Sequence, residues 1–185
     1  MKFAAIQPDE TVAVFGAGPI GLLTIACLKI AGAKRIWAVD PVAHRRDLAK
    51  QMGADIAFDA TDAAREIRID TSGRGVDCAI DCAAKQHTTN DAIRAVCNRG
   101  RVVITGIHSE THVPFEMSPM RRKELSVFNV RRSNHETPEA LKMLAEHARW
   151  LAPLVTHTLP MERIAEAFAI ANDYTDGVGK MVVKP

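Results

Sequence analysis

Continuous apolar runs alternate along this chain with stretches in which apolar residues recur every three or four positions. Short apolar runs are typical of strands buried in a parallel sheet, and the second pattern is typical of helices. The sequence predicts strands over 11–15, 35–39, 56–58, 76–83, 101–107 and 124–130. It predicts helices over 19–31, 41–52, 61–69, 91–98 and 137–149. This alternation indicates an α/β fold with a doubly wound, six-stranded parallel sheet of the Rossmann type.

The remaining segments divide the chain into two parts. We expect residues 108–123 to be irregular, because the segment contains two prolines and no apolar periodicity. After residue 150 the pattern predicts an extended piece, a helix and a last strand, over 154–159, 161–172 and 180–184. We therefore predict a dinucleotide-binding domain over 1–150 and a short helix-strand extension over 151–185.

Three glycines stand where the first predicted strand passes into the first predicted helix. In a dinucleotide site Gly16 makes the tight exit from the strand, Gly18 lets the backbone approach a pyrophosphate, and Gly21 allows close packing of the helix. A helix that begins here points unpaired N–H groups and the positive end of its dipole at phosphate groups. The pattern predicts a nucleotide site, and the alternative is a strand-to-helix turn that binds nothing.

An acidic residue closes the second predicted strand. Asp40 can accept hydrogen bonds from both hydroxyls of an adenosine ribose, and it would repel a ribose that carries a phosphate. Arg45, in the first turn of the next helix, can cover the adenosine end of the same ligand. The repulsion by Asp40 favours NAD, the unphosphorylated cofactor.

The ends of two later strands are expected to lie at the same rim of the sheet, because ligands of such folds bind at the carboxyl ends of parallel strands. The residues there are 82–84 and 105–107. Gly106 can admit a flat ring close to the backbone, or it can simply end a strand. The spacing leaves both alternatives open.

Composition narrows the choice of partners. The 185 residues carry 24 basic and 22 acidic side chains, a net charge of +2, so we expect neither a nucleic acid nor a membrane partner. No apolar run reaches the ~18 residues of a membrane span, and the start does not resemble a signal peptide, so we expect a cytosolic location. We expect the four cysteines to be reduced and the seven histidines to bind no metal. His108 and His112 would share a face only on a helix, which Pro114 opposes.

Several segments together resemble the medium-chain, zinc-type alcohol and polyol dehydrogenases, and sorbitol and threonine dehydrogenases look most similar. The segments are 12–22, Asp40, 53–55, 100–103 and 177–185. The resemblance implies that Gly18, Pro19 and Ile20 meet the pyrophosphate and that Asp40 and Arg45 hold the adenosine ribose. The other contacts that it implies are Ala83 near the adenine and its ribose, Thr105, Gly106 and Ile107 near the nicotinamide, Val130, Arg131 and Arg132 along the far edge, and Lys180 at the pyrophosphate.

The chain departs from that family in one large respect. Members hold the catalytic zinc with Cys, His and Glu ligands of an additional N-terminal domain, and no counterpart precedes residue 11. We therefore expect the NAD-binding portion of a dehydrogenase, which acts on a small alcohol or polyol only together with a catalytic domain. The resemblance also implies that 151–185 returns to that domain and that 113–115 and 124–130 form a homo-oligomer through an edge strand.

Two other classes stay open at this point. An S-adenosylmethionine-dependent methyltransferase also has Gly-x-Gly after its first strand and an acid after its second. Pro19, Gly21 and the lack of a C-terminal antiparallel hairpin argue against that class. A non-catalytic nucleotide-binding or dimerisation module is the third possibility.

Overall fold

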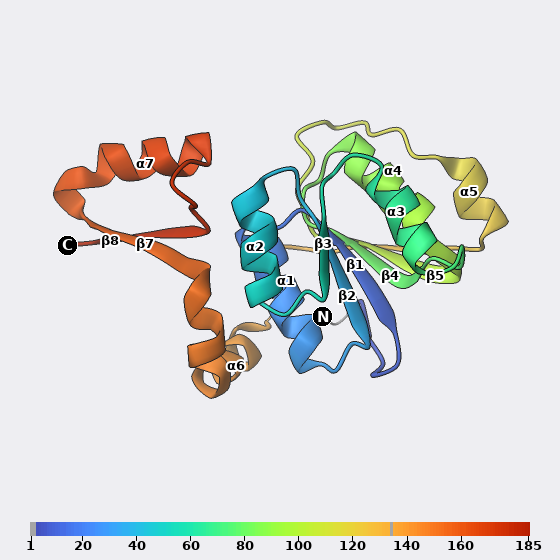
Figure 1. Ribbon diagram of the computed structural model, residues 1–185, viewed down its shortest axis with the longest axis horizontal. Helices are drawn as coiled ribbons and strands as arrows, with labels where there is room; N and C mark the ends of the chain where they lie inside the picture. Colours follow the sequence, from blue (N-terminus) through green and yellow to red (C-terminus); the bar gives the residue numbers. More distant parts are fainter. Residues whose placement is uncertain (1–2, 134) are drawn as a thin grey trace.

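A single parallel sheet organises most of the molecule. The computed structural model describes residues 3–133 and 135–185. Six strands lie side by side in the order β3-β2-β1-β4-β5-β6, and all are parallel (Figure 1). They are β1 (Thr11–Phe15), β2 (Arg35–Val39), β3 (Ile56–Phe58), β4 (Val76–Asp81), β5 (Val96–Ile104) and β6 (Ser126–Asn129). This is the Rossmann strand order, so the predicted fold class is confirmed.

Helices cover both faces of the sheet (Figure 1). On one face lie α1 (Pro19–Ile30) and α2 (Ala43–Gln51), and on the other lie α3 (Ala63–Asp70) and α4 (Gln86–Ala95). Each face has its own apolar core, with Leu22 and Ile25 in the first and Ile67 and Ile93 in the second. The two cores fix the sheet between the helical layers and leave the carboxyl ends of β1 and β4 free to form a site.

The C-terminal part forms a second, smaller sheet. After α6 (Thr137–Leu151) the chain makes the strand β7 (Val155–Pro160), the helix α7 (Ile164–Asp173) and the strand β8 (Lys180–Lys184), with 3-10 turns at Ala152–Leu154 and Met161–Arg163. β7 and β8 pair in parallel with each other and not with the main sheet. This unit lies on the side of the molecule where α1 and α2 are found, and Leu151 anchors it in their core (Figure 1).

The junction between α4 and β5 differs from the sequence prediction. A helix over 91–98 closed by Arg99 and Gly100 is wrong, because α4 ends at Ala95 and residues 96–100 already belong to β5. The ammonium group of Lys123 donates hydrogen bonds to the carbonyl oxygens of Ile93, Arg94 and Val96 at distances of 2.9–3.0 Å. These bonds satisfy carbonyl groups at the helix end, so the chain can leave the helix early and extend.

Smaller differences occur at other element ends. The segment predicted to be irregular contains α5 (Met117–Arg122), and Pro119 lies in its first turn, where a helix does not need its N–H group. The predicted strands over 76–83 and 101–107 end at Asp81 and Ile104, where the chain turns towards the rim. Among the described residues, no helix combines the length and the apolar character needed to cross a membrane.

Candidate functional site

The glycine turn after β1 is shaped by contacts that exclude larger side chains. Gly16 has a φ of +91°, in the left-handed region that favours glycine. A Cβ atom at Gly21 would lie 1.8 Å from the carbonyl oxygen of Gly16, so α1 packs tightly on the turn itself. A Cβ atom at Gly18 would meet no heavy atom within 4 Å. The middle glycine therefore faces open space at the start of α1.

Asp40 lies beneath this turn and supports it. Its side chain accepts hydrogen bonds from the backbone N–H of Ala17 (2.8 Å) and from that of Val42 (2.9 Å), one on each oxygen. The residue is only 3% exposed. A carboxylate offers about four acceptor positions, so two remain for a ligand. The bracing of the turn by Asp40 is a role that the sequence pattern did not indicate.

The turn and Asp40 form part of one cavity of about 610 Å³ at the carboxyl ends of β1, β2 and β4. Six of the predicted site residues line it, namely Gly16, Gly18, Pro19, Asp40, Arg45 and Ala83. The cavity also contains Lys85, His87 and Thr88 from the segment after β4, and Tyr174 from the C-terminal part. Two lysine or arginine side chains and the start of α1 surround this space, an arrangement that favours an anionic ligand.

Arg45 is a partly buried cation with few partners among the described residues. The side chain is 15% exposed, and its Nη1 lies 4.0 Å from Oδ2 of Asp40, beyond the length of a hydrogen bond. Its Nε is buried and has no hydrogen-bond partner in the part of the chain that the structure describes. Buried N–H groups in folded proteins nearly always have an acceptor. The orphaned donor at this position fits a ligand that supplies oxygen atoms.

A second buried carboxylate shapes the opposite wall of the cavity. Asp81, at the end of β4, accepts hydrogen bonds from the N–H groups of Ala83 and Ala84 at 3.0 Å and from the hydroxyl of Thr88 at 3.1 Å. These bonds turn the chain from β4 into α4. Ala83 is thereby held against Gly16, whose Cβ position would lie 2.9 Å from the Ala83 side chain. One side chain, Asp81, thus makes three hydrogen bonds to the turn that forms this wall.

Four further predicted residues gather in a separate cavity of about 290 Å³. They are Thr105, Val130, Arg131 and Arg132. The Thr105 hydroxyl donates to the Cys82 sulfur at 3.1 Å, and burial raises the pKa of the Cys82 thiol to about 11. The thiol is therefore protonated at neutral pH and serves as a packing group rather than a nucleophile.

Five predicted residues line neither of these cavities, namely Ile20, Gly21, Gly106, Ile107 and Lys180. Ile20 and Ile107 point outwards and are 57% and 74% exposed. A Cβ atom at Gly106 would lie 2.5 Å from the Cβ of Ala84, so close packing alone explains this glycine. Of the two alternatives for Gly106, the geometry supports the glycine that ends a strand.

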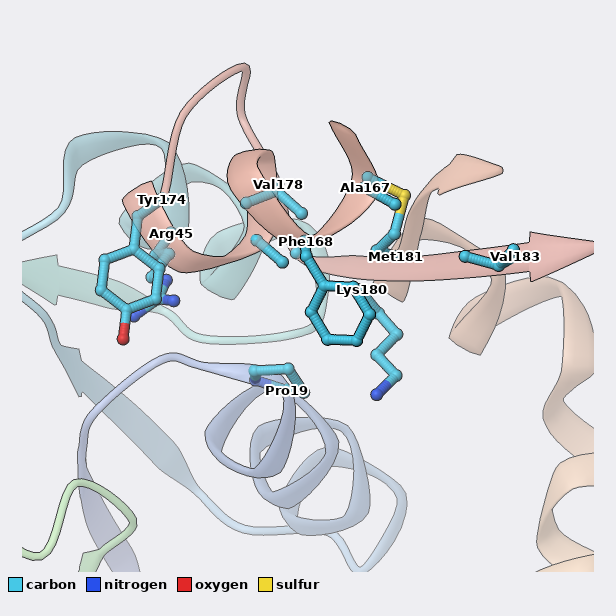
Figure 2. Close-up of a pocket in the computed structure, with 11 residues that line it drawn as sticks. Pro19, Arg45, Ala167, Phe168, Tyr174, Val178, Lys180, Met181 and Val183 are labelled. Carbon is cyan, nitrogen blue, oxygen red and sulfur yellow. The ribbon is translucent and has the colours of Figure 1, made fainter. Parts of the chain in front are cut away.

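Lys180, the last predicted residue, lines a third cavity of about 390 Å³ between α1 and the C-terminal unit. Figure 2 shows Lys180 reaching from β8 towards Pro19 at the start of α1, with Arg45 and Tyr174 on the other side of the same space. Pro19, Arg45 and Tyr174 also line the first cavity. The two cavities therefore adjoin at the start of α1.

The described residues contain no group of three His, Cys, Asp or Glu side chains that could hold a metal ion. His108 and His112 lie outside the helices, as predicted, and a ring nitrogen of His108 lies 3.2 Å from the hydroxyl of Thr89.

The chain is similar to dehydrogenases both in sequence and in structure. A family model described as zinc-binding dehydrogenase matches residues 19–146. Sorbitol dehydrogenase of Bacillus subtilis (strain 168) is 30% identical over 182 residues, which are 97% of this chain and 52% of that protein. The crystal structure of 2R,3R-butanediol dehydrogenase from Bacillus subtilis superposes with a TM-score of 0.88 at 29% identity, covering 100% of this chain and 53% of the other.

A third similar structure contains a cofactor. It is described as a short chain alcohol dehydrogenase from Escherichia coli CFT073 complexed with NADH, with a TM-score of 0.89, 25% identity, and coverage of 100% of this chain and 55% of that one. The methyltransferase alternative gains no support from these matches, and every strand pair among the described residues is parallel. The chain spans about half the length of the curated relatives it matches. Because the family match covers more than half of the chain, this protein belongs to the zinc-type, medium-chain alcohol and polyol dehydrogenase family.

Proposed function

We propose that this chain is the NAD-binding portion of an enzyme that transfers a hydride between an alcohol or polyol and NAD. The observation that carries this proposal is the cavity that combines open space at Gly18, the carboxylate of Asp40 and the orphaned N–H of Arg45. The family membership and the NADH complex of a similar structure support it.

Each part of the site has a separate task in this proposal. Gly18, Pro19 and Ile20 offer the start of α1 to the pyrophosphate, with Lys180 as a second cation beside it. Asp40 accepts hydrogen bonds from the ribose hydroxyls, and Arg45 covers the adenosine end. Ala83 lies in the wall on the adenine and ribose side.

The second cavity is the proposed place of the nicotinamide end. Thr105, Gly106 and Ile107 lie at the carboxyl end of β5, and Val130, Arg131 and Arg132 follow β6. When bound, NAD supplies a ring carbon that accepts or donates the hydride. In this proposal the four residues that line the cavity, Thr105, Val130, Arg131 and Arg132, orient the ring and restrict the entry of water.

Asp40 also sets the proposed choice between the two nicotinamide cofactors. It is buried, and its negative charge would face the 2′-phosphate of NADP at close range. Nη1 of Arg45 lies 4.0 Å from Oδ2 of Asp40 and offsets part of the carboxylate charge. We therefore propose a preference for NAD.

Substrate and zinc belong to the other half of the enzyme in this proposal. Residues 1–150 form the cofactor domain, and residues 151–185, which make the separate β7–β8 sheet, return to the catalytic domain as in relatives. The 185-residue chain alone is expected to bind NAD weakly and to oxidise no alcohol. A cytosolic location stays a prediction.

The sheet edge at β6 is the proposed contact between two copies of this chain. β6 is the last strand of the sheet, and no described strand pairs with its outer side. Uncovered edge strands favour pairing with another chain. Sedimentation analysis should give a dimer or higher oligomer, and Asn129→Pro, which removes an N–H group at this edge, should shift it towards monomer.

Calorimetry tests the cofactor proposal directly. NADH should bind to the 185-residue chain, and NADPH should bind at least tenfold more weakly. No heat of binding with NADH, or equal affinity for NADPH, would contradict the proposal. Zinc-dependent oxidation of an alcohol by this chain alone would contradict the division of labour between the two halves.

A further inference from the structure

Tyr174, which follows α7, is placed against the predicted nucleotide site from a distant part of the sequence. Its ring centroid lies 4.0 Å from the guanidinium carbon of Arg45, a cation–π contact. Figure 2 shows the ring laid over the Arg45 side chain. Tyr174 lines both the cavity with Gly18 and Asp40 and the neighbouring cavity with Lys180. The ring therefore stands on the border between the two cavities.

The backbone of Tyr174 also has an unusual conformation. Tyr174 caps α7 with a φ of +53°, in the left-handed region where helix ends usually have glycine or asparagine. Its N–H donates to the carbonyl oxygen of Ile170. Close by, a ring nitrogen of His44 lies 3.2 Å from the carbonyl oxygen of Val178. Two contacts thus join the start of α2 to the α7–β8 loop.

The orientation of the Arg45 guanidinium group has few other constraints among the described residues. Asp40 is 4.0 Å away, and the buried Nε has no hydrogen-bond partner among the described residues. An ion pair at this distance does not fix the plane of the guanidinium group, and no hydrogen bond from Nε does so. The Tyr174 ring can do so, because guanidinium groups stack on aromatic faces and the ring centroid lies 4.0 Å from the guanidinium carbon.

We propose that Tyr174 is a positioning residue for the adenosine end of the ligand. The ring holds the Arg45 guanidinium in place for a ribose or phosphate oxygen and closes the outer wall of the cavity. This inference rests on the proposed NAD site and extends it. Adenosine binding then couples the cofactor domain to the C-terminal segment, which the sequence pattern treats as a separate part.

The side chain can be observed directly, because Tyr174 is the single tyrosine of the sequence. Replacing tyrosine by 3-fluorotyrosine gives one fluorine NMR signal with no assignment problem. Titration with ADP-ribose, which carries the adenosine half of NAD, should shift this signal, and Arg45→Ala should abolish the shift. An unchanged signal at saturating ADP-ribose would overturn the proposal.

Binding constants supply the second test. Tyr174→Ala should weaken NADH binding by about 2- to 30-fold, the range of a cation–π contact. Tyr174→Phe, which keeps the ring face, should bind as the unmodified chain does. In an Arg45→Ala background, Tyr174→Ala should change the dissociation constant by less than about twofold, because the two residues act as a unit.

A matched control separates local from global effects. Ile164→Ala removes an exposed side chain from the same C-terminal helix and lines none of the three cavities. It should leave NADH binding unchanged. Equal or tighter binding by Tyr174→Ala overturns the positioning role while the NAD site stands, whereas no binding by the unmodified chain overturns both.

Discussion

Replacing Gly18 by alanine should weaken nucleotide binding without harming the fold. The residue has φ and ψ of −69° and −176°, a conformation that any residue adopts, and its Cβ would meet no heavy atom within 4 Å. Substitutions of glycine by alanine at such compatible positions stabilise proteins by about 0.4–1 kcal/mol. The melting temperature of Gly18→Ala should therefore equal or exceed that of the unmodified chain.

The effect on binding follows from where the methyl group would lie. It would occupy the open space at the start of α1, through which a pyrophosphate must approach the N–H groups. Loss of one hydrogen bond to a charged group costs about 1.5–3 kcal/mol. At 25 °C this corresponds to an NADH affinity that is about 10- to 150-fold weaker.

Gly21→Ala is the matched comparison, because its Cβ would lie 1.8 Å from the carbonyl oxygen of Gly16. Overpacking of this kind costs about 1–3 kcal/mol of stability. Thermal unfolding and calorimetric titration of both variants with NADH separate the two effects. If Gly18→Ala binds NADH as tightly as the unmodified chain, the pyrophosphate does not pass this residue. If it melts as low as Gly21→Ala, the geometric reasoning is wrong.

Three further predictions concern the charged side chains of Asp40, Asp77 and Lys123. Asp40→Asn should lower the free energy of unfolding in urea by about 1–3 kcal/mol, because one of two bracing acceptors is lost; unchanged stability would refute the bracing role. Burial alone would raise the pKa of Asp77, but hydrogen bonds from Arg74 and Thr11 outweigh burial and lower the pKa from 3.8 to about 2. The stability that the ionised Asp77 contributes is present above pH 3.8 and is lost as the pH falls towards 2. The urea midpoint should therefore fall less steeply with pH between 3.8 and 2 for Asp77→Asn than for the unmodified chain. Parallel plots of urea midpoint against pH for the two proteins would contradict this prediction. Lys123→Met should cost about 2 kcal/mol in the same urea assay by leaving carbonyl groups at the end of α4 unpaired, and a neutral result would mean that water replaces the ammonium group.

The strands and the glycine turn could be predicted because their signals are local. The apolar run over 35–39 forms β2 with the predicted ends, and the run over 180–184 forms β8. The glycine spacing after β1 predicted a turn that opens a helix, and Gly16 and Gly18 line one cavity with Asp40. Burial pattern and turn chemistry agree at these places, so a short window of sequence suffices.

The rest depends on contacts between distant residues, which a local pattern does not contain. The early end of α4 is set by Lys123, 28 positions after Ala95. The stack of Tyr174 on Arg45 joins residues that are far apart in the chain, and tyrosine is not a residue that predicts a left-handed helix cap. The sequence signal at Gly106 fits two roles, a glycine that admits a flat ring and a glycine that ends a strand. The close approach of Ala84 favours the second role.

The strand order also affects how the chain folds while a ribosome makes it. β1 lies between β2 and β4, so its second neighbour is missing until the nascent chain has passed Val76. Until then one edge of an apolar strand is exposed, and exposed strand edges promote aggregation during folding. Parallel pairing of β1 with β4 also requires the chain between these two strands to close a long loop before any contact between them forms. Slow translation between β3 and β4 would therefore extend the interval in which this edge of β1 stays exposed.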